Sequence, residues 1–152
     1  MELLLVFIAL FFCYLWINNK RKNKLKIYSI EHYMKMDNPI PVCGAPDVVW
    51  IDRQETLIVG DYKSRYNGKV YESDIIQLSV YRLLLEKTQA KKVAPYGFIH
   101  FKNRLRVKVD LLSSDEVISL YRQYQDVTGG TVKAHCTKNK GYCKYCEYLG
   151  SC

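Results

Sequence analysis

GAPDVVWIDRQETLIVGDYK, residues 44–63, contains two short apolar runs on either side of a polar turn. The runs at 47–52 and 56–61 are rich in β-branched residues, whose side chains suit the pleated surface of a sheet. Three polar residues, 53–55, separate the two runs. The sequence therefore predicts a β-hairpin here, around which the rest of the fold is built.

Polar residues stand at one end of both predicted strands. Asp47 opens the first strand, and Asp61 and Lys63 close the second. Because side chains alternate along a strand, Asp61 and Lys63 project from the same face, about 7 Å apart. A hairpin can bring Asp47 to that same end of the sheet. Two carboxylates and a backbone carbonyl make a hard-oxygen site suited to Mg²⁺ or Mn²⁺, and a nearby lysine can orient water and stabilise charge on a phosphate.

Residues 73–88 (SDIIQLSVYRLLLEKT) carry the strongest helix pattern in the chain. Apolar residues recur there at helical spacing, and Ser73 can cap the amino terminus. Gln77 and Tyr81 are four residues apart and share one face of this helix. Such a pair can hold a phosphate or a base edge beside the metal, although alone it could equally be a solvated helix face.

Further elements alternate with these. The runs at 95–101 and 105–112 predict a second pair of strands, and apolar spacing predicts a helix from Ser114 to Gly129-Gly130. The spacing in 27–36 (IYSIEHYMKM) predicts a short amphipathic helix. Helices that alternate with strand pairs indicate a small α/β sandwich.

The amino terminus is apolar and is followed by basic residues. Residues 3–17 (LLLVFIALFFCYLWI) contain no Pro, Gly or charge, and as a helix they would span about 22 Å. The first 26 residues carry half of the net charge of +8, and all of their basic residues follow this run. The positive-inside rule then predicts a single-pass transmembrane helix over 1–19, a basic linker over 20–26 and a cytoplasmic remainder. A buried core helix is the alternative.

Cysteines cluster at the carboxyl end of the chain. Four of the six lie within the last 17 residues: Cys136, Cys143, Cys146 and Cys152. In a reducing compartment, clustered thiolates are more often metal ligands than disulfides. Their spacing suits either a [4Fe–4S] cluster or tetrahedral Zn²⁺, with Cys43 as an alternative to Cys136 for the fourth ligand. We therefore expect a metal or iron–sulfur tail over 133–152.

These motifs resemble those of a known enzyme family. Pro46-Asp47, Asp61-x-Lys63 and Gln77-x-x-x-Tyr81 are similar to the PD-(D/E)XK nuclease superfamily, and the last motif resembles its RecB-like branch. The Cys143-x-x-Cys146-x5-Cys152 tail is similar to that of iron–sulfur members, which include CRISPR-associated exonucleases and AddB-type nucleases. The resemblance runs from about Cys43 to Cys152, roughly seven-tenths of the chain.

The resemblance implies a restriction-endonuclease-like α/β core over 27–132, a mixed sheet flanked by helices. It implies hydrolysis of DNA phosphodiester bonds with Mg²⁺ or Mn²⁺, as an exonuclease acting on single-stranded ends. The implied roles are metal binding by Asp47, Asp61 and the Tyr62 backbone carbonyl, catalysis by Lys63, and substrate and active-site geometry for Gln77 and Tyr81. DNA and the membrane are the expected partners.

Two features depart from the family pattern. Relatives usually carry a metal-binding histidine on an upstream helix, and His32 is the only upstream histidine here, without the surrounding motif. Iron–sulfur relatives take the fourth cysteine from an amino-terminal segment that the apolar run replaces. The alternative function is therefore a catalytically weak or inactive DNA-binding or scaffold protein on the same fold.

Overall fold

The computed structural model describes residues 11, 13, 14 and 25–133. The chain divides into two compact units, Met1–Ser114 and Asp115–Cys152. Phe11, Cys13 and Tyr14 are helical. No helix in the described part of the chain is long and apolar enough to span a membrane. The predicted transmembrane segment falls almost wholly outside the described residues.

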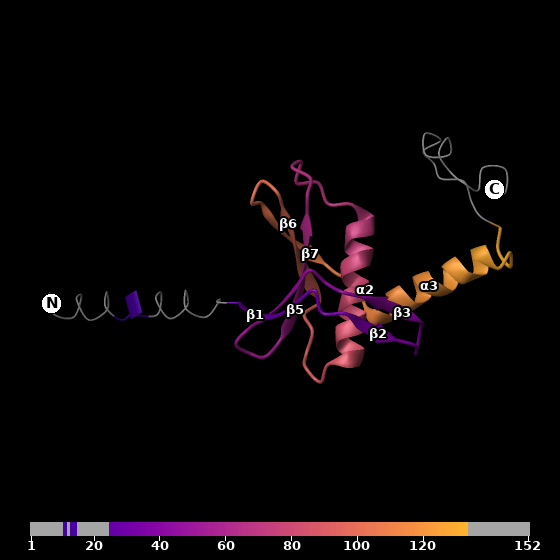
Figure 1. Ribbon diagram of the computed structural model, residues 1–152, viewed down its shortest axis with the longest axis horizontal. Helices are drawn as coiled ribbons and strands as arrows, with labels where there is room; N and C mark the ends of the chain where they lie inside the picture. The colour runs from indigo at the N-terminus through magenta and orange to yellow at the C-terminus, as the bar shows by residue number, and fades with distance from the viewer. Residues whose placement is uncertain (1–10, 12, 15–24, 134–152) are drawn as a thin grey trace. The chain divides into compact units, whose positions relative to one another are not determined.

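A five-stranded mixed sheet forms the centre of the first unit (Figure 1). In spatial order its strands are β1 (Lys26–Ile30), β4 (Val48–Ile51), β5 (Leu57–Lys63), β6 (Tyr96–Phe101) and β7 (Arg106–Asp110). Neighbouring strands are antiparallel except for β5 and β6, which are parallel. The crossover between these two contains helix α2 (Glu72–Thr88), and a parallel pair requires such a connection. The carboxyl ends of β5 and β6 therefore lie side by side.

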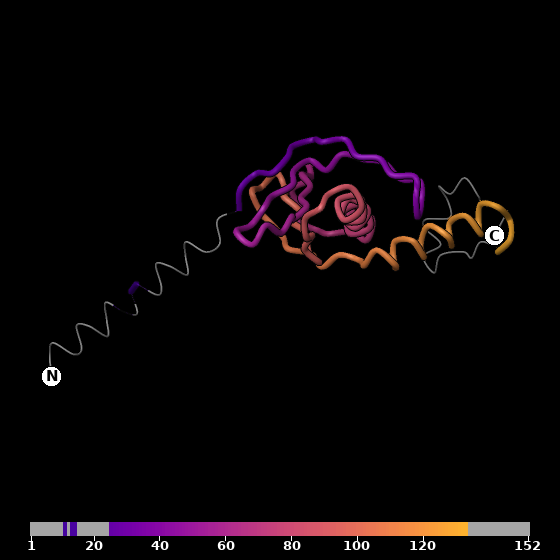
Figure 2. The backbone as a smooth tube through the Cα atoms, turned by 90° about the horizontal axis from the view of Figure 1, so that it is seen from below, coloured from indigo at the N-terminus to yellow at the C-terminus, as the bar shows by residue number. Residues whose placement is uncertain are grey.

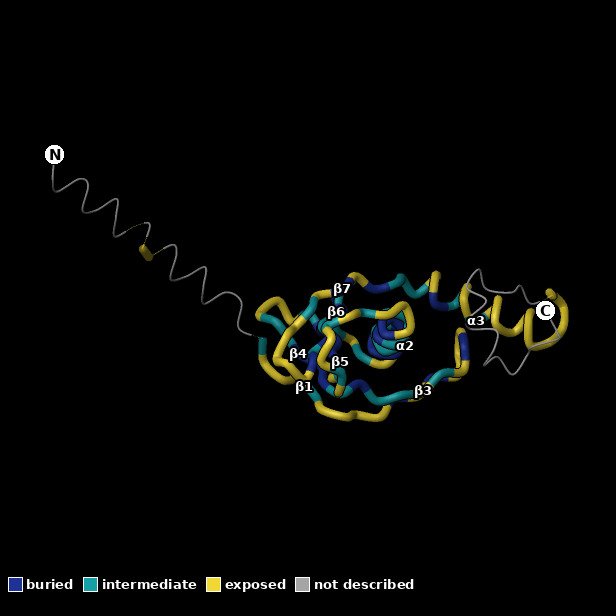
Figure 3. The backbone as a smooth tube through the Cα atoms, turned by 90° about the horizontal axis from the view of Figure 1, so that it is seen from above, coloured by how far each residue is buried: buried dark blue, intermediate teal, exposed yellow. Residues whose placement is uncertain are grey.

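Helix α2 packs against one face of the sheet (Figure 2). The helix also contacts a separate two-stranded ribbon of β2 (Met34–Met36) and β3 (Val42–Gly44). Its buried residues are mostly leucines, and Figure 3 shows the helix as a mixture of buried and intermediate residues. Fully burying a leucine contributes about 1.5–3 kcal/mol. Buried side chains of this layer include Leu78, Leu83, Leu84 and Leu85 on α2 and Leu57, Val59 and Ile99 on the strands.

The other face of the sheet has a small apolar cluster of its own. Val48, Trp50, Ile58 and Ala94 are buried in it, and Tyr96 and Phe98 are among the half-buried residues packed on it. The Trp50 ring lies over Gly60, where an added Cβ would be only 2.2 Å from Trp50 Cζ3. Glycine at this position therefore leaves room for the indole to approach β5 closely.

Most of the predicted elements are confirmed. The central hairpin is β4 and β5, with Val48 paired to Gly60, and the second strand pair is β6 and β7. The two long helices are α2 and α3 (Ser114–Thr128), and α3 is followed by Gly130 in the left-handed region at φ +74°. The Asn67 side chain accepts a hydrogen bond from Lys69 N in the turn before α2.

Two local predictions were wrong. Residues 27–36 are not a helix but β1 and β2, separated by a turn with Glu31 at φ +46°. Pairing of β1 with β4 satisfies its backbone, so the sheet overrides the three-to-four spacing of apolar residues. Ser73 does not cap α2, because Tyr71 is the N-cap and the Asp74 carboxylate accepts a hydrogen bond from Tyr71 N.

Candidate active site

Four side chains of the motifs form a series of contacts between β5 and α2, and the fifth, Asp47 at the start of β4, joins them through the backbone amide of Tyr62. Asp47 Oδ2 accepts a hydrogen bond from Tyr62 N at 2.6 Å, which joins the two strands. Asp61 Oδ2 lies 2.7 Å from Lys63 Nζ, which donates a hydrogen bond to Gln77 Oε1 at 2.9 Å. Gln77 Nε2 in turn donates to Tyr81 Oη at 3.0 Å. We call this set, Asp47, Asp61, Lys63, Gln77 and Tyr81, the motif cluster.

Backbone geometry explains why the motif cluster assembles. Asp61 and Lys63 are two residues apart on β5, so both side chains project toward α2. Gln77 and Tyr81 are one turn apart on α2 and lie on the same side of that helix. The Tyr81 ring also lies against Gly44, where a Cβ would be 2.7 Å from Tyr81 Cε1. The glycine just before Pro46-Asp47 therefore leaves room for the tyrosine.

Charge and burial both act on Asp61 and Lys63. Burial raises the pKa of Asp61 above its usual value, although the adjacent Lys63 ammonium lowers it, and the charges of Asp47 and Asp74 raise it further. Burial lowers the pKa of Lys63, but the contacts with Asp61 and Asp74 outweigh burial and leave this pKa raised. Lys63 is therefore a cation at neutral pH, held among carboxylates.

Asp74 and Arg65 form a second layer that the motifs did not reveal. Asp74 is 4% exposed and accepts hydrogen bonds from Tyr71 N and from the Arg65 guanidinium, and its Oδ1 lies 3.5 Å from Lys63 Nζ. Burial raises the pKa of Asp74, but the Tyr71 amide, Arg65 and Lys63 together lower it. The sequence signal for Asp74 was its position three residues before Gln77, on the same side of the helix.

The donor set fits a divalent cation. Asp61 Oδ2 is buried and, beyond its ion pair with Lys63, receives no well-directed hydrogen bond from the described residues. Lys63 already neutralises this oxygen, so the fit to a metal ion rests on the second carboxylate and on the acceptor positions that the two groups leave open. Asp47 is close enough for its charge to act on Asp61, so two carboxylates share the site. Within the described ranges, no three His, Cys, Asp or Glu side chains converge, so a cation here would rely on these two and on backbone or water oxygens.

The remaining predicted ligands are not part of the motif cluster. His32 is exposed in the turn after β1 and does not complete a three-ligand group with Asp47 and Asp61. Cys43 is a free, exposed cysteine on β3. The four cysteines of the tail, Cys136, Cys143, Cys146 and Cys152, lie outside the described residues.

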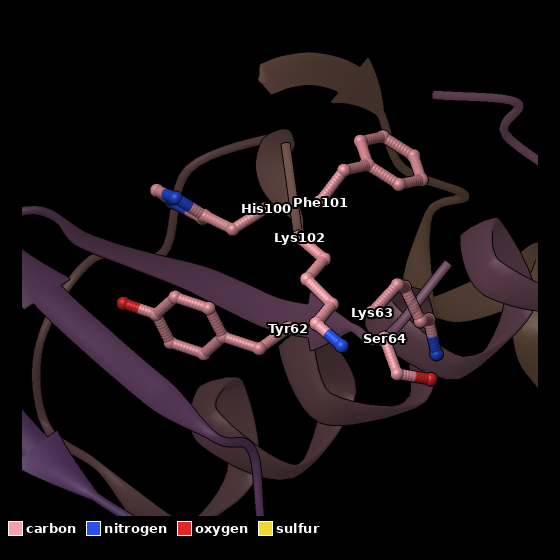
Figure 4. A pocket seen from close by; sticks show the side chains of 6 residues that line it. All are labelled: Tyr62, Lys63, Ser64, His100, Phe101 and Lys102. Atoms are coloured by element: carbon pink, nitrogen blue, oxygen red, sulfur yellow. The ribbon is translucent and has the colours of Figure 1, made fainter. Parts of the chain in front are cut away.

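A pocket of about 340 Å³ lies at the carboxyl ends of β5 and β6. Ligands of sheets with parallel strands commonly bind at this edge. Lys63 belongs both to the pocket and to the motif cluster, so the pocket adjoins the candidate catalytic residues. Its lining residues are Tyr62, Lys63, Ser64, His100, Phe101 and Lys102 (Figure 4).

Comparison with known proteins gave one family and several solved structures. The PD-(D/E)XK nuclease superfamily matches residues 7–152. No curated protein matches the chain. Twelve chains of solved structures match, and one of them is described as "Crystal structure of SSO0001". That structure is 15% identical with a TM-score of 0.49, and the match covers 95% of this chain and 69% of the other.

Proposed function

Because the chain belongs to the PD-(D/E)XK nuclease superfamily, we propose that it is a metal-dependent deoxyribonuclease with the motif cluster as its catalytic centre. Superfamily membership implies a nuclease-type function with nucleic acid as the partner, and the five-stranded mixed sheet fits a restriction-endonuclease-like core. The observation that carries the proposal is the position of Lys63 Nζ, 2.7 Å from the Asp61 carboxylate and 2.9 Å from Gln77.

Each member of the motif cluster has a chemical role in this proposal. Asp47 and Asp61, with the Tyr62 carbonyl, would hold Mg²⁺ or Mn²⁺, which supplies Lewis-acid activation of the phosphate and of the attacking water. Lys63 places a positive charge and hydrogen-bond donors beside the phosphoryl oxygens, where negative charge develops. Gln77 fixes the lysine ammonium, and Tyr81 fixes the Gln77 amide. The two α2 residues therefore hold Lys63 in one orientation before substrate binds.

The finer assignment is an exonuclease of the RecB-like branch that acts on single-stranded DNA ends. The Gln77-x-x-x-Tyr81 motif supports it, because Gln77 accepts a hydrogen bond from Lys63 and Tyr81 accepts one from Gln77. The proposal extends to a [4Fe–4S] cluster on the cysteine tail, with Zn²⁺ as the competing metal. It also includes a membrane tether formed by the apolar run, with the nuclease core in the cytoplasm. Sequence alone supports these last two parts.

The activity is tested on the full chain purified in detergent. End-labelled single- and double-stranded DNA are incubated with Mn²⁺ or Mg²⁺, and Lys63→Ala is compared with wild type. We expect stepwise shortening of single strands by wild type and a rate at least about 100-fold lower for Lys63→Ala. Lys87→Ala, an exposed lysine at the carboxyl end of α2, is the matched control.

The contrary outcome supports the scaffold alternative. Exposed His32 lies outside the motif cluster, and a missing third metal ligand could abolish turnover. The enzyme proposal would be overturned if wild type and Lys63→Ala bound DNA with the same affinity and neither cleaved it above background. For the tail, an absorbance band at about 400 nm after anaerobic purification supports an iron–sulfur cluster. Colourless protein with stoichiometric zinc would overturn the iron–sulfur assignment.

A further inference from the structure

The sheet face turned away from α2 carries a row of aromatic rings. Tyr96, Phe98 and His100 occupy alternate positions of β6, and Tyr62 of β5 is paired with His100. The centroids of the Tyr62 and His100 rings are 4.9 Å apart, and those of His100 and Trp50 are 5.2 Å apart. Tyr62 is 58% exposed, so the row begins in the apolar cluster and ends in solvent.

Two cations of β7 lie on the same face. Register pairs Arg106 with His100 and Lys108 with Phe98. The Arg106 guanidinium lies 4.4 Å from the Phe98 ring centroid, and Lys108 Nζ lies 3.9 Å from the Tyr96 centroid. Neither cation forms a salt bridge with a carboxylate of the described chain, although Asp110 follows on the same face of β7.

The aromatic row leads to the pocket beside the candidate catalytic centre. Tyr62 and His100 line the pocket together with Lys63 and with exposed Lys102, whose Nζ lies 5.0 Å from the Tyr66 ring centroid. Figure 4 shows the Tyr62 and His100 side chains extending to one side, with Lys63 and Phe101 on the other. His100 Nε2 is buried and has no hydrogen-bond partner among the described residues. A polar atom in that position requires a partner that the described residues do not supply.

We propose that this face, consisting of Tyr62, Phe98, His100, Arg106 and Lys108, binds single-stranded nucleic acid next to the catalytic centre. Tyr62, the exposed ring at the end of the row, can stack with an unpaired base, and Arg106 and Lys108, which lie over the Phe98 and Tyr96 rings, can hold backbone phosphates. An apolar partner would bury Arg106 and Lys108 without a counter-charge, which is costly. Charge complementarity therefore favours a polyanion with exposed bases over an apolar partner.

The choice of nucleic acid as the ligand rests on the proposed function. Binding to this face, however, needs neither metal nor turnover. Affinity is therefore measured in EDTA, by fluorescence anisotropy of the full chain with a labelled oligothymidylate of about 12 nucleotides. Wild-type hydrolysis of bis-(p-nitrophenyl) phosphate with Mn²⁺, a diester too short to cross the sheet, tests the catalytic centre separately. Failure of this hydrolysis counts against the proposed function, and only the EDTA measurement decides on the sheet face.

The decisive variants are Tyr62→Leu and the double variant Arg106→Ser/Lys108→Ser. We expect each to weaken oligothymidylate binding by about tenfold, since one stacked base or two phosphate contacts are lost. The double variant also lowers the slope of log affinity against log salt by about 1.4. Matched controls are Tyr33→Leu, an equally exposed tyrosine, and Lys35→Ser/Lys91→Ser, which removes the same charge elsewhere. Thermal melts establish that each variant is folded.

Three outcomes overturn the proposal. The first is an affinity loss no greater than in the matched controls. The second is an equal loss for a duplex of the same length, which would show a general electrostatic surface without stacking. The third is a changed oligomeric state, measured by light scattering, with unchanged oligonucleotide affinity, because the face would then be an interface between copies of the chain.

Discussion

At the level of single residues, Asp74 links the candidate catalytic centre to the stability of the fold. Its carboxylate joins the first turn of α2 to Arg65 and lies beside Lys63. The motifs do not show the contacts of Asp74 with Arg65 and Lys63, because these contacts depend on how the end of β5 meets α2. The spacing of Asp61, Lys63, Gln77 and Tyr81 could be read from the sequence, since each pair lies on one element. For the buried second layer the sequence offers only the position of Asp74 three residues before Gln77, and its contacts with Arg65 and Lys63 could not be read from the motifs.

Asp74→Asn should lower the free energy of unfolding by about 1–3 kcal/mol at pH 7, because a charged hydrogen-bond acceptor is replaced by a neutral one. The pKa of Asp74 is lowered in the folded protein, so its contribution is present above the unfolded-state pKa and is lost as pH falls through the folded-state pKa. Wild type and variant should therefore converge in stability in acid. Urea unfolding at pH 7 and at about pH 3 measures both values.

The control for this prediction is Asp37→Asn, which removes an exposed carboxylate paired with Lys35. Exposed pairs contribute about 0–1 kcal/mol, so this variant should change stability little at either pH. A gap between wild type and Asp74→Asn that stayed constant from neutral to acid pH would show that shape, and not charge, explains the loss.

Among the secondary-structure elements, the strands β4 to β7 followed their sequence pattern, and β1, which like β7 is an edge strand, did not. β4, β5 and β6 are rich in β-branched or aromatic residues and pair on two sides, and the edge strand β7 alternates apolar with polar residues, so all four were predicted. β1 pairs only with β4, and its residues Ile27 and Ile30 are exposed. The spacing of apolar residues in β1 therefore does not correspond to a buried face. The parallel pairing of β5 with β6 also depends on where α2 packs, which no local pattern specifies.

The contact of β4 with β5 gives a prediction at this scale. Gly60→Ala should destabilise the protein by about 1–3 kcal/mol, because the new Cβ would meet the Trp50 ring at 2.2 Å. The indole would tilt, so tryptophan fluorescence should change together with the unfolding midpoint. Trp50→Leu removes the obstructing ring, so the additional cost of Gly60→Ala should be smaller in that background. Equal costs in the two backgrounds would contradict the steric explanation and point to the backbone of β5 instead.

For the molecule as a whole, the amino-terminal run decides where the proposed nuclease works. Ala9→Asp/Leu10→Asp places two charges at the centre of that run, at a cost of about 2.5–3.5 kcal/mol each for insertion into a membrane. We expect wild type in the carbonate-resistant membrane fraction and the variant largely in the supernatant. Ile27→Asp/Ile30→Asp makes the same chemical change at exposed positions of β1, an edge strand that tolerates charge, and should leave the protein in the membrane fraction. Recovery of wild type and both variants in the supernatant would reject the tether. If the run packs against protein instead, two buried charges without partners should destabilise only the Ala9→Asp/Leu10→Asp variant.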